Sequence, residues 1–366
     1  MTRHKAAPPR RSPINMKFAI GYQAPSAGFS TAELALSYKE HISEVYFSWP
    51  GMSSGRPPVF GGEDISPEEG EQILLQELKV IKEAGIGPDL LLNANCYGKD
   101  SISAEFELEI CSVLSALEAA DVLPSVVTTT SPFAAEVVKK HYPSMEIRAS
   151  VNMRIGTVQA MKYASSLFDS FYIQRDFQRD IEYVKKISAW CKDNGKKLCM
   201  LANSGCLRFC PGQSFHDNLI AHASEVRETK NLPGFDPHTC WRLYKDETNR
   251  PEILKSTFIR PEDLYRYEGL VDVVKLATRQ HSHPAGVVGA YAAGTWNGDL
   301  LELFEPGFSP AFYPFYLDNS LVPEDFFEKT SHCTFGCTDC GYCEEVYRKI
   351  LKNYETDLGP ILTCGF

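Results

Sequence analysis

The segment Glu68–Asn93, EEGEQILLQELKVIKEAGIGPDLLLN, contains the unit that decides the fold. Four apolar side chains in its first part recur at spacings that keep one face of a helix apolar: Ile73, Leu74, Leu78 and Ile81. We therefore predict a helix over Glu68–Ala84 and a buried strand over Pro88–Asn93 (PDLLLN). A helix that leads through a short turn into a buried strand is half of a repeating unit that favours parallel strands.

The same alternation runs along most of the chain. Seven further apolar or β-branched runs predict strands: Lys17–Tyr22, Ser43–Ser48, Pro124–Thr129, Glu146–Val151, Leu167–Ile173, Lys196–Leu201 and Val271–Leu276. Helical patterns separate them, clearest in Ser103–Ala119 and Asp180–Trp190. Eight parallel strands joined by right-handed crossovers predict an α/β fold, a (β/α)8 TIM-like barrel. A doubly wound open sheet is the alternative, and the count of eight favours the barrel.

The chain divides into three predicted parts. Residues 1–16 form a disordered basic leader, residues 17–294 the TIM-like barrel and residues 295–366 a C-terminal cysteine-rich cap. The leader could instead be an arm that binds a partner. The stretch Ser204–Lys255, between predicted strands seven and eight, is an insertion rich in Cys, His, Pro and Asn. We expect the insertion and the cap to cover one end of the barrel.

Composition narrows the function. With 366 residues, 43% of them hydrophobic, the chain can bury a large core, and its formal net charge of −10 disfavours loose binding to RNA or to anionic membranes. No apolar run approaches the roughly 20 residues that cross a bilayer, and the start lacks the apolar core of a signal peptide. We expect a cytoplasmic protein. Its twelve cysteines should then bind metal or pack as small apolar residues rather than form disulfides.

Polar residues follow nearly every predicted strand, and barrel enzymes place their chemistry at these C-terminal strand ends. They are Gln23, Asn93, Asn95, Thr129, Thr130, Asn152, Arg154, Gln174, Arg175, Asn203, Lys275 and Arg279. Turn formation and capping explain any single one of them. The convergence of four cations with several amides instead predicts a site for a small anionic substrate. We expect Asn95, Asn152, Arg154, Arg175 and Asn203 to bind it, and Lys275 and Arg279 to take part in catalysis.

The densest cysteine pattern is SHCTFGCTDCGYCEE, residues 331–345, in which the predicted metal ligands are Cys333, Cys337, Cys340 and Cys343. A CxxCxxC run with one further cysteine wraps a 4Fe–4S cluster, and Cys333 or Cys364 could be that further ligand. Zinc is the alternative metal, although structural zinc sites usually split their ligands into two separated pairs. Enzymes that cleave S-adenosylmethionine also use CxxxCxxC, but after the first barrel strand rather than after the eighth.

A second cysteine set lies in NSGCLRFCPGQSFH, residues 203–216, and returns at Cys240. We predict Cys206, Cys210 and Cys240 as metal ligands at the barrel mouth, since Pro, Gly and His around them make poor core material. The fourth ligand could be Cys96, a C-terminal cysteine or the substrate itself. The protein would then hold one 4Fe–4S cluster or two. Cysteines inside helix or strand patterns are predicted to pack instead: Cys111, Cys191 and Cys199.

Histidines cluster near the second cysteine set. His216 is the best candidate for proton transfer, because the unperturbed pKa of histidine lies close to neutral pH. His222 and His238 are more typical of loop or capping residues, and His281 and His283 could line the barrel mouth. The sequence contains no Walker loop and no GxGxxG motif, and we expect no serine nucleophile elbow.

These segments resemble the collagenase-like peptidase U32 family. The resemblance spans roughly Lys17 to Gly289 and is carried, in the family's order, by FYIQRDF, NSGCLRFCPGQSFH, Cys240-Trp-Arg and VDVVKLATR. It implies a barrel with a four-cysteine 4Fe–4S cluster, of which Cys206, Cys210 and Cys240 match three ligands. It also implies oxygen-independent hydroxylation, on RNA bases with prephenate as a helper or on a ubiquinone precursor. The acid that the family commonly has between the strand-eight Lys and Arg is absent here.

Three functional hypotheses follow. The first is an iron–sulfur oxidoreductase acting on a small, anionic or nucleobase-like molecule, with the C-terminal cysteines relaying electrons from a donor protein. The second is a peptidase, as the family name indicates, although the sequence shows no zinc-protease motif and no nucleophile paired with a base. The third is a non-catalytic cluster or zinc protein that recruits a partner. The net charge disfavours RNA, and the oligomeric state stays open.

Overall fold

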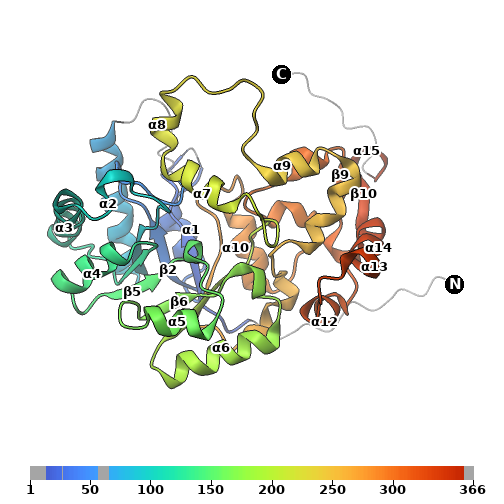
Figure 1. The fold of residues 1–366 in the computed structure, drawn as a ribbon, viewed down its shortest axis with the longest axis horizontal. Helices are drawn as coiled ribbons and strands as arrows, with labels where there is room; N and C mark the ends of the chain where they lie inside the picture. The colour runs from blue at the N-terminus through green and yellow to red at the C-terminus, as the bar shows by residue number, and fades with distance from the viewer. Residues whose placement is uncertain (1–13, 27, 57–65, 358–366) are drawn as a thin grey trace.

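The computed structural model describes residues 14–26, 28–56 and 66–357, and in it eight parallel strands close into a barrel (Figure 1). The strands are β1 (Phe18–Gly21), β2 (Ile42–Phe47), β3 (Gly87–Leu92), β4 (Val126–Thr129), β5 (Glu146–Ala149), β6 (Ser170–Tyr172), β7 (Lys197–Leu201) and β8 (Val273–Lys275). They neighbour one another in chain order, and β8 pairs with β1. The predicted α/β barrel is confirmed, and the open sheet is excluded because the first and last strands are hydrogen-bonded.

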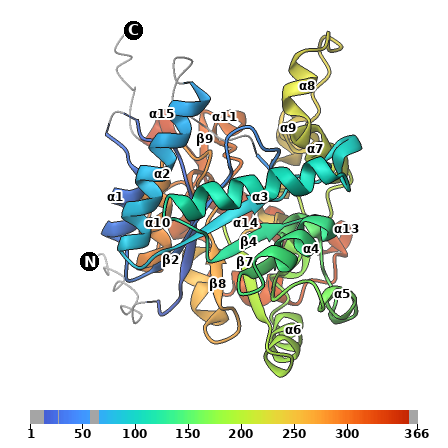
Figure 2. The same cartoon turned by 90° about the vertical axis from the view of Figure 1, so that its left-hand side faces the viewer.

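Helices follow the strands and cover the outside of the barrel (Figure 2). They are α1 (Thr31–Ser37), α2 (Pro67–Glu83), α3 (Ala104–Ala119), α4 (Pro132–His141), α5 (Val158–Ala164), α6 (Ile181–Asp193) and α10 (Pro284–Ala293). The predicted apolar face of α2 is buried through Leu74, Leu78 and Ile81. This helix starts where it does because Ser66 and Glu69 form a reciprocal capping box.

The barrel interior contains a layer of buried charge among its apolar side chains. Arg148 of β5 is fully buried and donates to both carboxylate oxygens of Glu44 on β2, at 2.6 and 2.9 Å. The same guanidinium donates to Glu146 at 2.8 Å and lies 3.7 Å from Asp89 of β3. Although burial raises the pKa of Glu146, the charge of Arg148 and a bond from Lys197 lower it to about 2. The layer therefore ties β2, β3 and β5 together through ion pairs.

The insertion after β7 and the C-terminal extension build a second apolar core beside the barrel. The insertion holds α7 (Gln213–Ala221), α8 (Ala223–Arg227) and α9 (Thr239–Tyr244). The extension holds α11 (Ser309–Phe312), β9 (Phe315–Leu317), α12 (Phe326–Ser331), α13 (Cys337–Cys340), α14 (Tyr342–Ile350), β10 (Leu351–Asn353) and α15 (Tyr354–Asp357). Tyr244 and Leu254 of the insertion share this core with Phe304 and Phe308 of the extension. The two segments therefore pack on each other, next to the strand ends (Figure 1).

Short 3-10 turns complete the chain between these elements. They are η1 (Gly98–Asp100), η2 (Val151–Met153), η3 (Arg175–Phe177), η4 (Glu247–Lys255), η5 (Pro261–Tyr267), η6 (Leu300–Leu303) and η7 (Asn319–Leu321). None of the described helices is both long and apolar enough to cross a membrane. Most of the predicted leader and Cys364 lie outside the described residues. The predicted division into leader, barrel and cap stays a prediction.

Candidate functional site

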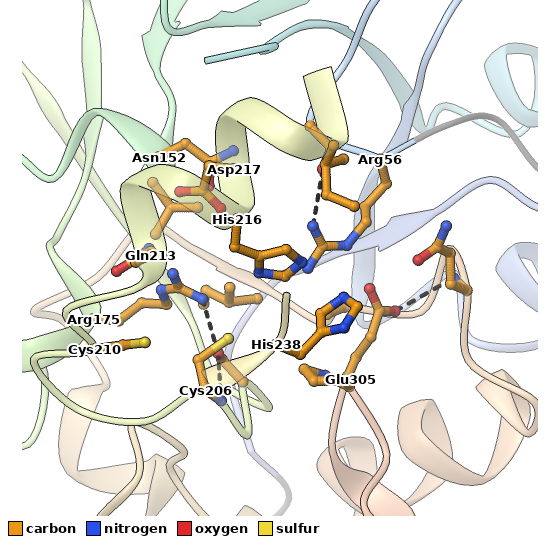
Figure 3. A pocket seen from close by; sticks show the side chains of 18 of the residues that line it. Arg56, Asn152, Arg175, Cys206, Cys210, Gln213, His216, Asp217, His238 and Glu305 are labelled. Carbon is orange, nitrogen blue, oxygen red and sulfur yellow. Dashed lines mark hydrogen bonds between the residues drawn. The ribbon is translucent and has the colours of Figure 1, made fainter. Parts of the chain in front are cut away.

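A cavity of about 410 Å³ opens at the C-terminal ends of the barrel strands (Figure 3). Its floor includes Tyr46, Leu91 and Lys275, near the ends of β2, β3 and β8. Its roof comes from the insertion, through α7 and α9, and from Glu305 of the extension. The site thus occupies the face where a barrel of this type carries its chemistry.

Three thiols line this cavity. Cys206 and Cys210 come from the loop after β7, and Cys240 is in the first turn of α9. The loop and the helix touch: a Cβ built on Gly212 would lie 2.3 Å from Thr239 Oγ1 and 3.9 Å from Cys210 Sγ. Burial, with repulsion from Cys206, raises the pKa of Cys240 to about 12. The structure therefore brings the three predicted ligands to one cavity.

The segment after β6 fixes the loop that carries Cys206 and Cys210. Asp176 is buried, and its carboxylate accepts the Phe209 backbone N–H at 2.5 Å. Its backbone carbonyl accepts from Arg208 Nε at 2.5 Å. The neighbouring Arg175 donates to Ser204 Oγ at 3.0 Å and hydrogen-bonds the Cys206 thiol. The FYIQRDF segment thus positions the cysteine loop and brings a cation to one of its sulfurs (Figure 3).

Cationic side chains dominate the cavity wall. The five are Arg56, Arg175, Arg227, Lys275 and Arg279, against two carboxylates, Asp217 and Glu305. Lys275 Nζ lies 3.5 Å from the centre of the Tyr46 ring, and burial lowers its pKa, an effect that the charge of Asp89 opposes. The Arg279 guanidinium donates to Ser48 and Ser54 at 3.2 and 3.3 Å. The excess of positive charge favours an anionic ligand.

Gly21 allows the segment after β8 to pack tightly against the end of β1. A Cβ on Gly21, at the end of β1, would lie 2.7 Å from the backbone nitrogen and the Cβ of Arg279. It would also lie 2.8 Å from the Tyr46 ring. No side chain fits there, so the segment after β8 can pass close enough for Arg279 to reach the cavity. Burial lowers the pKa of Arg279 to about 10, which leaves the guanidinium charged at neutral pH.

The structure divides the predicted substrate residues into two groups. Asn152 and Arg175 line the cavity. Asn95 and Arg154 instead hold Asp217 of α7, with donor–acceptor distances of 3.3 and 3.4 Å. Asn203 is fully buried: its amide donates to the carbonyls of Ala277 and Leu303, both at 2.9 Å, and accepts the Ala277 N–H at 2.6 Å. These three side chains support the wall of the cavity rather than form it.

His216 lines the cavity and faces His238 across it, with ring centres 4.8 Å apart (Figure 3). Burial, helped by the charge of Arg56, lowers the pKa of His216 to about 4. The imidazole is therefore neutral at pH 7, and the part of His216 in proton transfer stays a prediction. His281 and His283 lie beside an adjacent cavity of about 430 Å³ with Glu302 and Glu305.

Sequence reasoning missed several residues of the site. Arg56 lies in the loop after β2, where the Gly- and Ser-rich run 51–56 was the only signal. Glu305 comes from the extension, and its carboxylate accepts the Gln280 N–H at 3.3 Å. Asp217 of α7 accepts hydrogen bonds from Asn95 and Arg154. No strand-end pattern marks Glu305 or Asp217, because tertiary packing alone brings them to the mouth.

Cys96, one candidate for the fourth ligand, is paired elsewhere. Its thiol hydrogen-bonds His222 and accepts the Gly98 N–H at 3.4 Å. His222 Nδ1 lies 3.2 Å from the Glu225 carboxylate. The hydrogen bond from His222 lowers the pKa of Cys96. His222 and Glu225 border a separate cavity of about 420 Å³, so this thiol does not complete the set at the barrel mouth.

The C-terminal cysteines form a group of their own. Cys333, Cys337, Cys340 and Cys343 line a further cavity, of about 350 Å³, together with Arg179, Arg208 and Lys255. Cys337 and Cys340 are exposed, and the other two are half-buried. The cysteines expected to pack behave differently, since Cys191 and Cys199 are buried and Cys111 packs against the barrel core. The two predicted ligand sets thus line two separate cavities.

The donor chemistry at both sites suits iron–sulfur or zinc, which bind thiolates. The arginines next to the sulfurs also suit a centre with net negative charge. Within residues 14–26, 28–56 and 66–357, no three His, Cys, Asp or Glu side chains already stand close enough together to hold a metal ion. The residues present therefore fit such a centre by chemistry, and binding would have to draw the sulfurs together.

Fold and site together define a (β/α)8-barrel protein with a thiol- and arginine-lined cavity at the mouth. No family model matches the chain. An uncharacterized protease of Methanocaldococcus jannaschii, MJ1657, is 27% identical over 322 residues, which cover 86% of this chain and 90% of that protein. The solved structure of the U32 peptidase Mk0906 has the same fold, with a TM-score of 0.50 and 16% identity, over 74% of this chain and 95% of that one. The chain is therefore similar in sequence to MJ1657 and similar in fold to the U32 peptidase Mk0906.

Proposed function

We propose that the chain is an iron–sulfur redox enzyme that acts on a small anionic molecule in the cavity at the barrel mouth. The observation that carries this proposal is the meeting of three thiols and five cations around one cavity. The reaction class is oxygen-independent hydroxylation or related redox chemistry, on a substrate of metabolite or nucleobase size. A reducing, cytoplasmic location suits it, since the eleven described cysteines are all free.

Cys206, Cys210 and Cys240 would hold the cluster. A bound 4Fe–4S cluster supplies one-electron chemistry next to the substrate. Arg175 hydrogen-bonds the Cys206 thiol and so brings a positive charge next to one sulfur of this set. No other cysteine of the described part of the chain lines this cavity, so none of those thiols would supply the fourth ligand.

Lys275, Arg279 and Arg56 would bind the anionic group of the substrate. Each is a donor that makes no ion pair with another described residue. The apolar part would lie against Leu91, Leu201 and Trp241, which line the same cavity. A ligand held in this way has its charged end at the barrel floor and its other end towards the thiols and the histidines.

Lys275 can also move a proton. Asp89 lies close enough for its charge to act on Lys275, and its Oδ1 has no hydrogen-bond partner among the described residues. Burial raises the pKa of Asp89 and lowers that of Lys275, so the difference in proton affinity between the two groups shrinks. Since Lys275 faces the cavity, we assign it the proton exchange with the substrate and Asp89 the positioning of that proton.

Anaerobic reconstitution with iron and sulfide tests this proposal. Changing Cys206 and Cys240 together to Ser should remove about four irons per chain and the visible absorbance that goes with them. Cys111→Ser is the matched control, because this cysteine is remote from the cavity and should leave the iron content unchanged. An iron content that the double substitution does not change would overturn the proposal.

A second candidate function rests on Cys96. MJ1657 carries the name of a protease and Mk0906 that of a peptidase. A cysteine hydrogen-bonded to a histidine that also contacts a carboxylate is the arrangement of a thiol hydrolase. Peptide hydrolysis that Cys96→Ala abolishes, and that Cys206→Ser leaves intact, would favour a peptidase. Hydrolysis absent from the wild type over a peptide library would exclude it.

A further inference from the structure

The four C-terminal cysteines have no part in the function proposed above. They line a cavity of about 350 Å³ between the insertion and the extension, next to α13 and α14. Four cations, Arg179, Arg208, Lys255 and Lys329, line it as well, against the two carboxylates of Glu252 and Glu344. Cys333 and Cys337 both lie close enough to Cys343 and to Arg208 to interact with them electrostatically. The cavity thus combines soft donors with positive charge, as a site for an anionic metal–thiolate centre does.

A buried arginine in this cavity has an unused donor. Arg179 is only 4% exposed, and it donates to the carbonyls of Phe258 and Leu254 at 2.9 and 2.8 Å. Its Nη2 has no hydrogen-bond partner among the residues that the structure describes. Leaving a buried charged donor unpaired costs more than leaving a neutral one unpaired. An anionic occupant beside Cys343 would satisfy it, so this observation points to a ligand independently of the cysteine spacing.

The two cysteine loops are built against each other. Phe209 lies between Cys206 and Cys210, and Phe335 lies between Cys333 and Cys337. Their rings meet edge to face with centres 5.1 Å apart, and the Arg208 guanidinium lies 4.4 Å from the centre of the Phe335 ring. Both phenylalanines have positive φ, +54° and +63°, a conformation that bulky residues rarely adopt. Such strain persists only where the surrounding structure enforces it, so the contact is a built feature.

We infer that Cys333, Cys337, Cys340 and Cys343 bind a second iron–sulfur centre, and that the contact between the two loops makes it the entry point for electrons to the barrel mouth. The site itself stands on the cavity and on Arg179, whereas the electron route rests on the function proposed above. Cys337 and Cys340 are exposed, so a donor protein can reach this side. The mouth thiols are less open, because the insertion and Glu305 cover them.

The electron transfer is balanced without further reactants. A one-electron donor, such as a reduced low-potential iron–sulfur protein, loses one electron to the C-terminal centre. A centre held by the four C-terminal thiolates would pass that electron on to the mouth site and return to its oxidised state. No covalent bond forms or breaks, and no proton is needed. Arg208 and Phe209 contact Phe335, and this contact joins the Cys206–Cys210 loop to the C-terminal cysteines. We infer that the electron follows this connection.

Metal analysis of the full chain, reconstituted anaerobically with iron and sulfide, tests the site. The wild type should bind about eight irons, and Cys337→Ser with Cys340→Ser should lose about four of them. Maleimide should label Cys337 and Cys340 in the metal-free protein and fail to label them after reconstitution, because ligation protects a thiol. Cys111→Ser is the control for both readouts. Unchanged iron and unprotected thiols would overturn the site, and zinc in place of iron would overturn the electron route.

The contact itself is tested by EPR on the dithionite-reduced protein. Magnetic interaction between two centres should broaden the wild-type signal and vanish in either double cysteine variant. Arg208→Gln should keep both sets of iron but shift the midpoint potential of the C-terminal centre downwards, because a nearby cation stabilises the more negative, reduced form. Lys185→Gln, an exposed cation paired with Glu182, is the control and should shift nothing. Two non-interacting signals, or a potential indifferent to Arg208, would overturn the route.

The same variants separate the two proposals. If Cys206→Ser with Cys240→Ser loses no iron while Cys337→Ser with Cys340→Ser loses all of it, the site inferred here stands. In that case both the function proposed above and the electron route fail. If the mouth variant alone loses iron, the mouth proposal stands and the C-terminal site is overturned.

Discussion

The charges inside the barrel and the charges at its mouth are arranged in opposite ways. Inside, Arg148 is fully buried, and carboxylates of Glu44 and Glu146 lie within 3 Å of it. At the mouth, Lys275 and Arg279 are also buried, but they make no ion pair within the described part of the chain. Leaving buried charge unpaired costs stability, so it is retained where a ligand supplies the missing partner. We therefore assign the inner layer around Arg148 to folding, and we propose that the outer layer, Lys275 and Arg279, serves binding.

The largest expected effect comes from breaking the inner layer. Arg148→Met leaves three carboxylates without their buried counter-ion, and the free energy of unfolding should fall by about 3–5 kcal/mol, measured by chemical denaturation. Lys197→Met is the control, since this exposed partner of Glu146 should cost no more than about 1 kcal/mol. Equal losses for the two variants would contradict the assignment of the inner layer to folding.

Asn203 tests the supporting wall of the cavity. Asn203→Ala leaves the Ala277 N–H and the carbonyls of Ala277 and Leu303 without the partner that the amide supplied. The free energy of unfolding should fall by about 2–3 kcal/mol, because each buried polar group left unpaired is costly. Asn152→Ala, at the cavity wall, is the matched control and should change stability little. A loss of ligand binding without a loss of stability would instead make Asn203 a binding residue.

The outer layer should behave in the opposite way from Arg148. Lys275→Met and Arg279→Met should leave the unfolding free energy within about 1 kcal/mol of the wild type, since neither breaks an ion pair. Each should weaken the binding of small carboxylates and phosphates roughly tenfold to a hundredfold, the value of one charge-assisted hydrogen bond. Calorimetric titration with such anions measures this. Binding that neither substitution changes would contradict an anion site at the mouth.

The smallest expected effect concerns pH. The folded pKa of His216 is about 4, below its unfolded value of 6.5, so the unfolded chain binds more protons between these values. Stability should therefore be complete above pH 6.5 and fall as the pH drops towards 4. The His216→Gln variant lacks this term and should lose roughly 1 kcal/mol less over that range, after allowance for the partial exposure of the ring. Parallel pH profiles for the two proteins would show that the ring is not buried as described.

The sequence predicted the barrel because the spacing of apolar residues and the number of strand-like runs can both be read directly from it. It also placed Lys275 and Arg279 at the mouth, because both follow the last strand, and their part in catalysis stays a prediction. It could not place Arg56 or Glu305, which reach the site through loop and extension packing. Nor could it tell that Asn203 supports the wall, because its partners lie 74 and 100 residues away along the chain. Nothing in the sequence indicated that Glu44, Asp89 and Arg148 form ion pairs, because only the closed barrel brings these strand residues together.

The pairing of thiols with free cations at one mouth is tested most directly by an anomalous-difference map at the iron edge, from crystals grown anaerobically after reconstitution. We expect a peak in the cavity beside Cys206, Cys210 and Cys240 that Cys206→Ser with Cys240→Ser removes. A map with iron at the C-terminal cysteines alone, or at neither set, would contradict the account.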